Sequence, residues 1–215
     1  MPEYFSSLDF HDICDKLAAI DPDLSGILKS YGYPPLWSRP NNFETLVHFI
    51  LEQQVSLASA LAALHKLKQH VAEFTPETII AMTEPEMRAC YCSRQKQGYI
   101  KNIASAIISG ELDLVAFGTM EDKDIRFKLT KLKGIGNWTA DVYLMFVLQR
   151  ADIFPHGDLA AVNALKSLKL LPSDANRNKI DEISMQWKPY RTIATMMLWH
   201  LYLSKRSETK RLAGN

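Results

Sequence analysis

The chain has 215 residues, of which 47% are hydrophobic, enough for a substantial core in one domain or in two closely packed lobes. Its formal net charge is +1 at pH 7, so no global basic charge indicates a nucleic-acid partner, and a contact with a polyanion would need a local patch or backbone donors. Three cysteines exclude a disulfide framework. The polar N-terminus and the interrupted apolar stretches exclude a signal peptide and a membrane span, so an intracellular protein is predicted.

Hydrophobic residues recur at spacings of three and four along most of the chain, as they do on one face of a helix. Alternating patterns typical of strands are nearly absent, so the predicted fold class is all-α. The expected helices lie around residues 10–20, 43–51, 57–71, 100–107, 125–132, 138–149, 162–168, 180–187 and 193–201.

Several of these helices have start or stop signals. Asp21-Pro22 is expected to stop the first helix, and Asn41 with Glu44 resembles a capping box for the helix near residue 43. Two more starts are indicated by Thr75-Pro76 and by Thr83 with Glu86. The polar and basic tail from residue 204 onward is expected to fray.

The segment 31–42 is the best candidate for a connection between lobes. It holds three prolines and a glycine, which exclude a regular helix. The chain is therefore expected to divide into residues 1–42, 43–150 and 151–215, with the N-terminal helices packing against the C-terminal lobe.

The most informative segment begins with Lys133-Gly134-Ile135-Gly136, between two predicted helices. Two glycines around one apolar residue allow a tight turn with positive φ, and Ile135 can fold inward between the helices. The turn leaves backbone N–H groups uncovered at a helix N-terminus, a site that suits a phosphate oxygen. Alone, this pattern is equally compatible with a plain helix cap and turn.

A second signal, Pro155-His156-Gly157-Asp158, follows about twenty residues later. The proline and glycine place Asp158 at a bend, as the N-cap of a helix through Val162. Aspartate is a favoured cap, so in isolation Asp158 would be interpreted as a cap alone.

Together, the glycine hairpin and the aspartate loop resemble the helix-hairpin-helix (HhH-GPD) DNA glycosylase superfamily, and its 3-methyladenine branch in particular. The similarity extends from about residue 43 to about residue 203. Its other motifs are Phe43 to Ser56, which contains Gln53-Gln54-Val55-Ser56, and Trp187-Lys188-Pro189-Tyr190-Arg191 with Trp199. The resemblance implies two helical lobes with a cleft between them, into which a damaged base is flipped.

The resemblance also implies how the hairpin holds DNA. The backbone amides around Gly134, Gly136 and Thr139 would bind a phosphate. The main-chain carbonyls of Thr130, Leu132 and Ile135 match positions that hold a monovalent cation, Na⁺ or K⁺, in relatives. That ion would be structural and electrostatic, not catalytic.

The Gln53-Gln54 pair matches the loop that fills the gap left by the flipped base. Gln54 aligns with the wedge position, and a glutamine can hydrogen-bond to the orphaned base. The alternative for both residues is a polar helix end that faces solvent.

By the same resemblance, Asp158 is the catalytic carboxylate. Breaking the bond between sugar and base builds positive charge on the deoxyribose, which a nearby carboxylate stabilises while it orients or deprotonates water. An alkylated purine is already cationic and leaves easily, so one carboxylate can suffice.

Trp138 stands where the family members that also cut the backbone carry a Schiff-base lysine. The chain is therefore expected to be a monofunctional hydrolase of N-glycosyl bonds that leaves an abasic site. Trp138, and Tyr190 with it, would face the base pocket, where an indole contributes about 0.5–2 kcal/mol to a cationic base. The alternative for Trp138 is core packing. Val142 replaces an aromatic residue of some relatives, which leaves the substrate range open.

No cofactor is expected to be required. An iron–sulfur cluster needs four cysteines near the C-terminus, and Cys14, Cys90 and Cys92 are interpreted as packing residues. The expected partner is double-stranded DNA with damaged bases, bound by a monomer. Five basic residues could contact phosphates or be merely solvated: Lys131, Lys133, Arg191, Lys205 and Arg206.

Three other interpretations stay open. The same scaffold could remove another base, such as hypoxanthine or ethenoadenine. It could also remove uracil, a mismatch product or an oxidised base, although these neutral bases need more polar pocket groups than the sequence offers. A noncatalytic helix-hairpin-helix DNA-binding module would not need Asp158. In a purely helical scaffold protein, the glycines and the Gln-Gln loop would be incidental.

Overall fold

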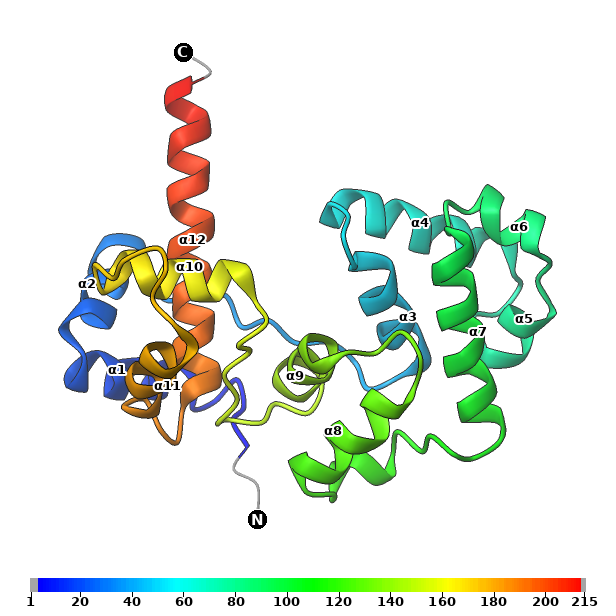
Figure 1. The fold of residues 1–215 in the computed structure, drawn as a ribbon, viewed down its shortest axis with the longest axis horizontal. Helices are drawn as coiled ribbons and strands as arrows, with labels where there is room; N and C mark the ends of the chain where they lie inside the picture. Colours follow the sequence, from blue (N-terminus) through cyan, green and yellow to red (C-terminus); the bar gives the residue numbers. More distant parts are fainter. Residues whose placement is uncertain (1–3, 214–215) are drawn as a thin grey trace. The chain divides into compact units, whose positions relative to one another are not determined.

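The computed structural model describes residues 4–213. Within this range the chain forms helices and no strand, apart from an isolated antiparallel bridge between Tyr4 and Arg150 (Figure 1). The all-α prediction is confirmed. No helix in the described range combines the length and the apolar character needed to cross a bilayer.

The helices divide into two compact units. Unit 1 combines residues 1–38 and 144–215, and unit 2 is the continuous segment 39–143. The chain passes from one unit to the other at Ser38–Arg39, inside the proline-rich segment, and again at Tyr143–Leu144, inside a helix. The sequence had suggested divisions at 42/43 and 150/151.

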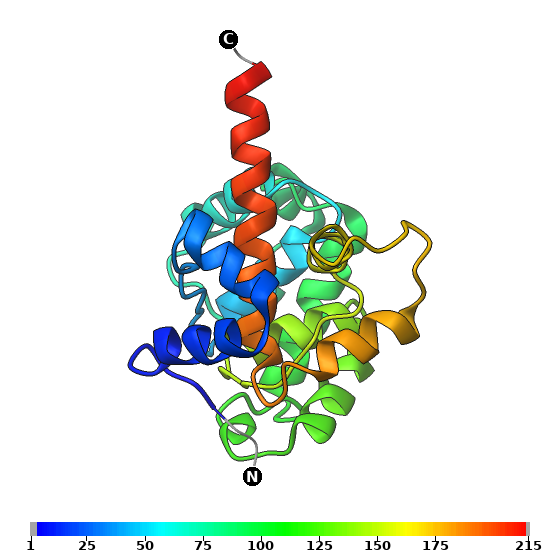
Figure 2. The same ribbon diagram turned by 90° about the vertical axis from the view of Figure 1, so that its left-hand side faces the viewer.

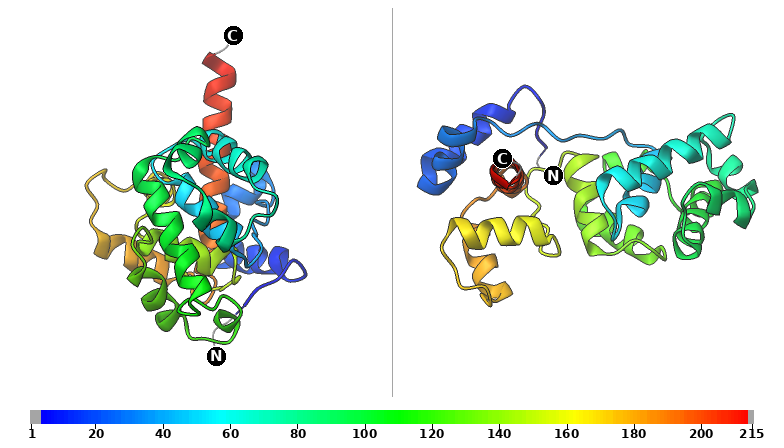
Figure 3. Two further views of the ribbon diagram at one scale, coloured as in Figure 1. Left: turned by 90° about the vertical axis from the view of Figure 1, so that its right-hand side faces the viewer. Right: turned by 90° about the horizontal axis from the view of Figure 1, so that it is seen from above.

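Unit 1 is assembled from both ends of the chain. Its helices are α1 (Phe10–Ile20), α2 (Pro22–Tyr31), the end of α9 (Asn137–Phe146), α10 (Leu159–Leu168), α11 (Arg177–Met185) and α12 (Arg191–Ala213). Figures 2 and 3 show α12 running between the N-terminal pair α1–α2 and the pair α10–α11. Its first half is buried there and supplies Ile193, Met197 and Leu201 to a core that also contains Trp187.

Unit 2 is built on α3 and α7. Its helices are α3 (Phe43–Glu52), α4 (Leu57–His70), α5 (Pro76–Ala81), α6 (Glu84–Ala89), α7 (Arg94–Ile108), the 3-10 turn η1 (Ala116–Gly118), α8 (Asp122–Lys131) and the start of α9. Helix α3 packs against both α4 and α7, which Figure 3 shows in the view onto this unit. The α3 residues Leu46, Phe49 and Ile50 are buried.

The predicted starts of α5 and α6 are confirmed, because Thr75 and Thr83 both form capping boxes. The start predicted at Asn41 is wrong by one residue. Asn42 caps α3 by accepting from the Thr45 amide at 3.0 Å. The Asn41 side chain is occupied elsewhere, since its Oδ1 accepts from the Tyr143 hydroxyl and its Nδ2 donates to the Leu114 carbonyl.

Three other elements differ from the expectation. Asp21-Pro22 stops α1 but also starts α2, because the Asp21 side chain accepts from the amides of Asp23 and Leu24. Helix α9 ends at Phe146 and not near Gln149, which has a left-handed φ of 51° and donates to the last carbonyls of the helix. The tail beyond residue 204, where the sequence predicts fraying, belongs to α12, which continues to Ala213.

Candidate active site

The hairpin between α8 and α9 is a tight turn over residues 132–136. The Ile135 amide donates to the Leu132 carbonyl at 3.0 Å, and Ile135 itself is buried, as predicted. Gly134 has a φ of +103°, and the methyl carbon of an alanine at this position would overlap the Tyr99 ring on α7. Two independent constraints, backbone conformation and packing, therefore require glycine at position 134.

The second glycine of the hairpin occupies the N-cap position of α9. The Gly136 carbonyl accepts from the Ala140 amide at 3.0 Å, and Gly136 and Asn137 are exposed. The amides of the first helical turn, which include that of Thr139, have no partner within a helix. An exposed helix start of this kind offers donors and a favourable dipole to an anion.

Gln53 joins the end of α3 to the hairpin. Its Nε2 donates to the Gly134 carbonyl at 2.8 Å and to the Thr139 hydroxyl at 3.3 Å. Gln53 is half-buried, whereas the next residue, Gln54, is exposed and has a left-handed φ of 58°. The two neighbouring glutamines therefore have different surroundings, one bonded to the hairpin and one presented to solvent.

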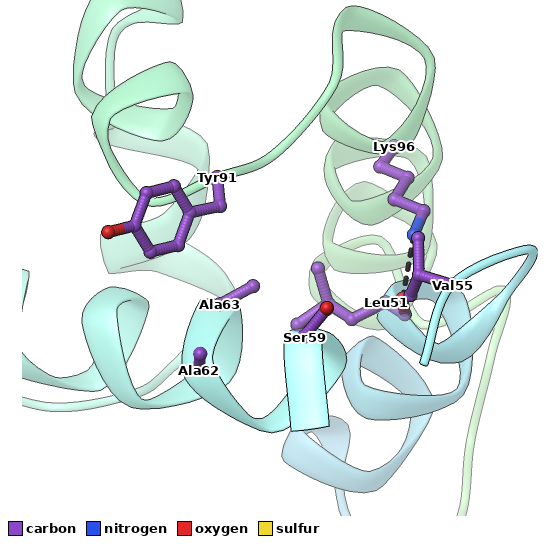
Figure 4. Close-up of a pocket in the computed structure, with 7 residues that line it drawn as sticks. All are labelled: Leu51, Val55, Ser59, Ala62, Ala63, Tyr91 and Lys96. Atoms are coloured by element: carbon purple, nitrogen blue, oxygen red, sulfur yellow. Dashed lines mark hydrogen bonds between the residues drawn. The ribbon is translucent and has the colours of Figure 1, made fainter. Parts of the chain in front are cut away.

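A pocket of about 250 Å³ lies beside this glutamine loop in unit 2 (Figure 4). Its walls are mostly apolar and include Leu51 and Val55, and the Tyr91 ring and the Lys96 side chain approach it from opposite sides. Burial lowers the pKa of Lys96, whose Nζ donates to the Leu51 carbonyl at 2.6 Å. The ammonium thus stabilises the C-terminal end of α3, from which the glutamine loop leaves.

Asp158 is the N-cap of α10 in unit 1, as predicted. A turn precedes it, in which its amide donates to the Pro155 carbonyl at 2.8 Å. Its Oδ1 accepts from the Ala161 amide at 2.8 Å and from the indole Nε1 of Trp199 at 3.0 Å. The side chain is largely buried, with 9% of the residue exposed. A cap needs only the backbone partner, so the indole bond indicates that the carboxylate is also oriented by its tertiary surroundings.

Trp199 belongs to a small aromatic group beside Asp158. The Trp37 ring meets it edge-on at a centroid distance of 6.1 Å, and the Phe146 ring lies 5.3 Å away. All three side chains are half-buried. They come from three distant parts of the sequence, and the Trp37 and Phe146 rings pack against the indole that bonds to the carboxylate.

The model of the HhH-GPD superfamily of base excision DNA repair proteins matches residues 47–190, about two thirds of the chain. The chain belongs to the HhH-GPD superfamily.

Relatives of known name cover most of the chain. The DNA-3-methyladenine glycosylase 1 of Schizosaccharomyces pombe is 32% identical over 190 residues, which are 85% of this chain and 83% of the relative. A putative DNA-3-methyladenine glycosylase of Bacillus subtilis, YfjP, is 29% identical over 82% of this chain, which spans 64% of that relative's length. The structure of the S. pombe 3-methyladenine DNA glycosylase in complex with abasic DNA has a TM-score of 0.79 and 30% identity, and covers 87% of this chain and 95% of that one.

The two residues expected in the base pocket belong to different units, Trp138 to unit 2 and Tyr190 to unit 1. Trp138 is half-buried in the first turn of α9. Tyr190 packs against the core of unit 1, and the ammonium of Lys16 lies 5.9 Å from its ring centroid. Trp199, which the sequence had marked only as part of a motif, bonds directly to Asp158. Its contact could not be read from spacing, because the two residues are 41 positions apart.

The remaining candidates have ordinary surroundings. The three cysteines are buried and unpaired, and burial raises the pKa of Cys14 and Cys92 to about 12, so both thiols are protonated packing groups. Arg191 forms a two-pronged ion pair with Asp152, at 2.6 and 3.0 Å. The Lys131 ammonium lies over the Phe127 ring. In the described part of the chain, no three His, Cys, Asp or Glu side chains gather as a metal site would require.

Proposed function

We propose that this protein is a DNA glycosylase that flips alkylated purines of the 3-methyladenine and 7-methylguanine type out of duplex DNA and hydrolyses their N-glycosyl bond. Membership of the HhH-GPD superfamily and the names of the relatives support this activity. The single observation that carries it is the Asp158 carboxylate, largely buried and held by Trp199 at the start of α10.

Asp158 would act on the sugar. As the bond to the base lengthens, positive charge develops on the deoxyribose, and a fixed, largely buried carboxylate stabilises it. The same group orients or deprotonates the attacking water. A cationic alkylated base leaves without much help, so the aromatic group of Trp37, Phe146 and Trp199 can serve binding and shape rather than acid catalysis.

The reaction would stop at the abasic site. The first turn of α9 carries Trp138, which has no amine to form a Schiff base with the sugar. We assign Trp138 and Tyr190 to the base pocket, where an electron-rich ring attracts a cationic base. Trp199 would position the carboxylate through its bond to Asp158.

The hairpin would hold the DNA backbone. The amides around Gly134, Gly136 and Thr139 are assigned to a phosphate, because the start of α9 is exposed and its dipole favours an anion. Gln54 is assigned as the wedge, because it is exposed and unconstrained by the hairpin. Gln53, the other residue of the wedge motif, would set the position of that loop through its bonds to Gly134 and Thr139.

No cofactor is assigned to the chemistry. The chain has three cysteines in all, fewer than an iron–sulfur cluster needs. A monovalent cation, Na⁺ or K⁺, is assigned to the carbonyls of Thr130, Leu132 and Ile135 at the hairpin. The Leu132 carbonyl accepts from the Ile135 amide and retains a second lone pair, so it can still contribute. Because its substrate is DNA, the protein would act inside the cell. It would act as a monomer.

The test compares wild type, Asp158→Asn and Asp158→Ala on a methylated duplex, with released base and alkali-labile sites measured. Asparagine keeps the helix cap and can still accept from Trp199, so Asp158→Asn should fold and bind DNA normally. Because it loses the charge, base release should fall by at least about a hundredfold, as for loss of an electrostatic catalyst. Asp158→Ala should also lose about 1 kcal/mol of stability with the cap.

Each other outcome has a clear meaning. Full activity of Asp158→Asn would show that Asp158 is a cap alone. If wild type bound the duplex and released nothing, a DNA-binding module would be the better interpretation. Release from duplexes with hypoxanthine, ethenoadenine or uracil but not from methylated ones would assign another substrate. Strand nicking by wild type without alkali would contradict the monofunctional mechanism.

A further inference from the structure

A second pocket lies in unit 1 between α10 and the exposed half of α12. None of the hairpin residues lines it. Its volume is about 340 Å³, which is at the lower end of the range for ligand pockets. Ala164 and Leu201 form an apolar floor, since only 4% of each is exposed, and the half-buried Tyr202 adjoins them. We call this the α10–α12 pocket.

The rim of the α10–α12 pocket consists of hydrogen-bond donors and cations. Asn163 and Ser167 stand one helical turn apart on α10, and Lys205 and Arg206 face them from α12. All four are exposed, and no carboxylate lines the pocket. In the described part of the chain neither Lys205 nor Arg206 forms an ion pair, in contrast to Lys169, which is held by two carboxylates.

Positive charge is concentrated in the C-terminal part of α12. The part of α12 beyond Leu203 carries four basic residues and one acidic residue, Glu208, although the whole chain has a net charge of only +1. The rest of the chain is thus slightly negative. Figures 1 and 2 show this half of α12 extending beyond the helices of unit 1 that surround its first half. Its charges are therefore accessible to a large partner.

The chemistry of the pocket fits one kind of polymer. A sugar–phosphate backbone alternates apolar deoxyribose rings with phosphates, and hydroxyl, amide and basic side chains are its usual contacts. We propose that the α10–α12 pocket and the basic end of α12 bind the backbone of undamaged duplex DNA, as a site additional to the hairpin. A deoxyribose would lie on the floor, with flanking phosphates at Lys205 and Arg206. The site would add sequence-independent affinity and take no part in base release.

The test measures binding of the full chain to an undamaged fluorescent duplex by anisotropy over a range of salt concentrations. Each phosphate contact contributes about 0.9 to the slope of log K against log salt. Lys205→Gln combined with Arg206→Gln should therefore lower the slope by about 1.8 and weaken binding at low salt. The matched control, Arg177→Gln with Lys179→Gln on α11, removes the same charge from residues that already have carboxylate partners. It should change the slope far less.

A second variant tests the pocket separately from the charge. Ser167→Glu leaves every cation in place but puts a carboxylate on the rim, and it should weaken binding at least as much as loss of one cation does. Thermal melts check that all variants fold, and base release by the Arg177→Gln, Lys179→Gln control should stay unchanged. Equal slopes for the double variant and its control would overturn the proposal, as would normal DNA binding by Ser167→Glu. Loss of binding to anionic vesicles without loss of DNA binding would assign a membrane surface instead.

Discussion

At the scale of single residues, two side chains owe their proposed roles to a hydrogen bond with a distant partner. Aspartate at a helix start is explained by capping alone, and the bond from Trp199 to Oδ1 is what sets Asp158 apart. Gln53 likewise stands at an ordinary helix end, but its amide reaches the hairpin more than 80 positions away in sequence. In both cases a tertiary hydrogen bond holds the polar group, which for Asp158 adds to the cap bond within its own helix.

We predict that substitution of Gln53 lowers the stability of the fold, whereas substitution of Gln54 affects only base flipping. Gln53→Ala removes the donor to the Gly134 carbonyl and to Thr139, so it should lower the free energy of unfolding in urea by about 1–3 kcal/mol and weaken DNA binding. Gln54→Ala changes an exposed side chain, so its stability should stay within about 0.5 kcal/mol of wild type. It should instead reduce flipping, measured by the fluorescence of 2-aminopurine in the duplex. Equal stability of the two variants would refute the role of Gln53.

At the scale of elements, the hairpin is fixed from two sides. Tyr99 of α7 packs on Gly134, and Gln53 at the end of α3 bonds to the carbonyl of the same residue. The turn therefore belongs to the α3–α7 core of unit 2 and is not a loose connection between α8 and α9. Rigid donors suit phosphate binding, because less conformational entropy is lost when the anion arrives.

The two hairpin glycines should respond differently to alanine. Gly134→Ala puts a methyl group against the Tyr99 ring at a positive φ, so it should destabilise the fold by more than about 2 kcal/mol. Adding Tyr99→Ala should restore part of this loss by removing the clash. At Gly136 a Cβ meets nothing within 4 Å, so Gly136→Ala should stay within about 1 kcal/mol of wild type. Urea unfolding measures all three, and a Gly134→Ala variant as stable as Gly136→Ala would contradict the packing.

At the scale of the whole molecule, unit 1 depends on bonds between the two ends of the chain. Asp21, between α1 and α2, accepts from Lys169 Nζ at 2.7 and 2.8 Å and from Trp187 Nε1 at 2.8 Å. Burial alone would raise the pKa of Asp21, but these hydrogen bonds outweigh burial and hold the pKa below its usual range. The bonds join the N-terminal helices to the ends of α10 and α11.

This network predicts how unit 1 responds to acid. Because the pKa of Asp21 is lower in the folded state, its stabilisation is complete above the ordinary aspartate value, near pH 4, and is lost as the pH falls through the folded value. Asp21→Asn keeps the cap of α2 but loses the charge, so its free energy of unfolding near neutral pH should be lower by about 2 kcal/mol. A fully buried ion pair would cost more, but Lys169 is partly exposed. The difference should shrink on acidification. Urea unfolding between pH 3 and pH 7 measures it, and a constant difference would exclude the ion pair as the cause.

Local patterns in the sequence determined much of the fold and part of the candidate site. The helical spacing, the caps at Thr75, Thr83 and Asp158, and the inward Ile135 all depend on neighbours within a few residues, so they could be predicted without tertiary information. Motif order along the chain likewise sufficed for the HhH-GPD resemblance, which the family match confirms.

Tertiary structure decided the rest. In the sequence, Asn41 and Asn42 are equally plausible caps of α3. Only the hydrogen bonds of Asn41 with Tyr143 and Leu114 show that its side chain does not cap the helix. The difference between Gln53 and Gln54, and the bond from Trp199 to Asp158, likewise depend on partners tens of residues away. Such contacts leave no periodic trace in a single sequence, because the side chains that make them are selected by proximity in space, which only the packing of the helices creates.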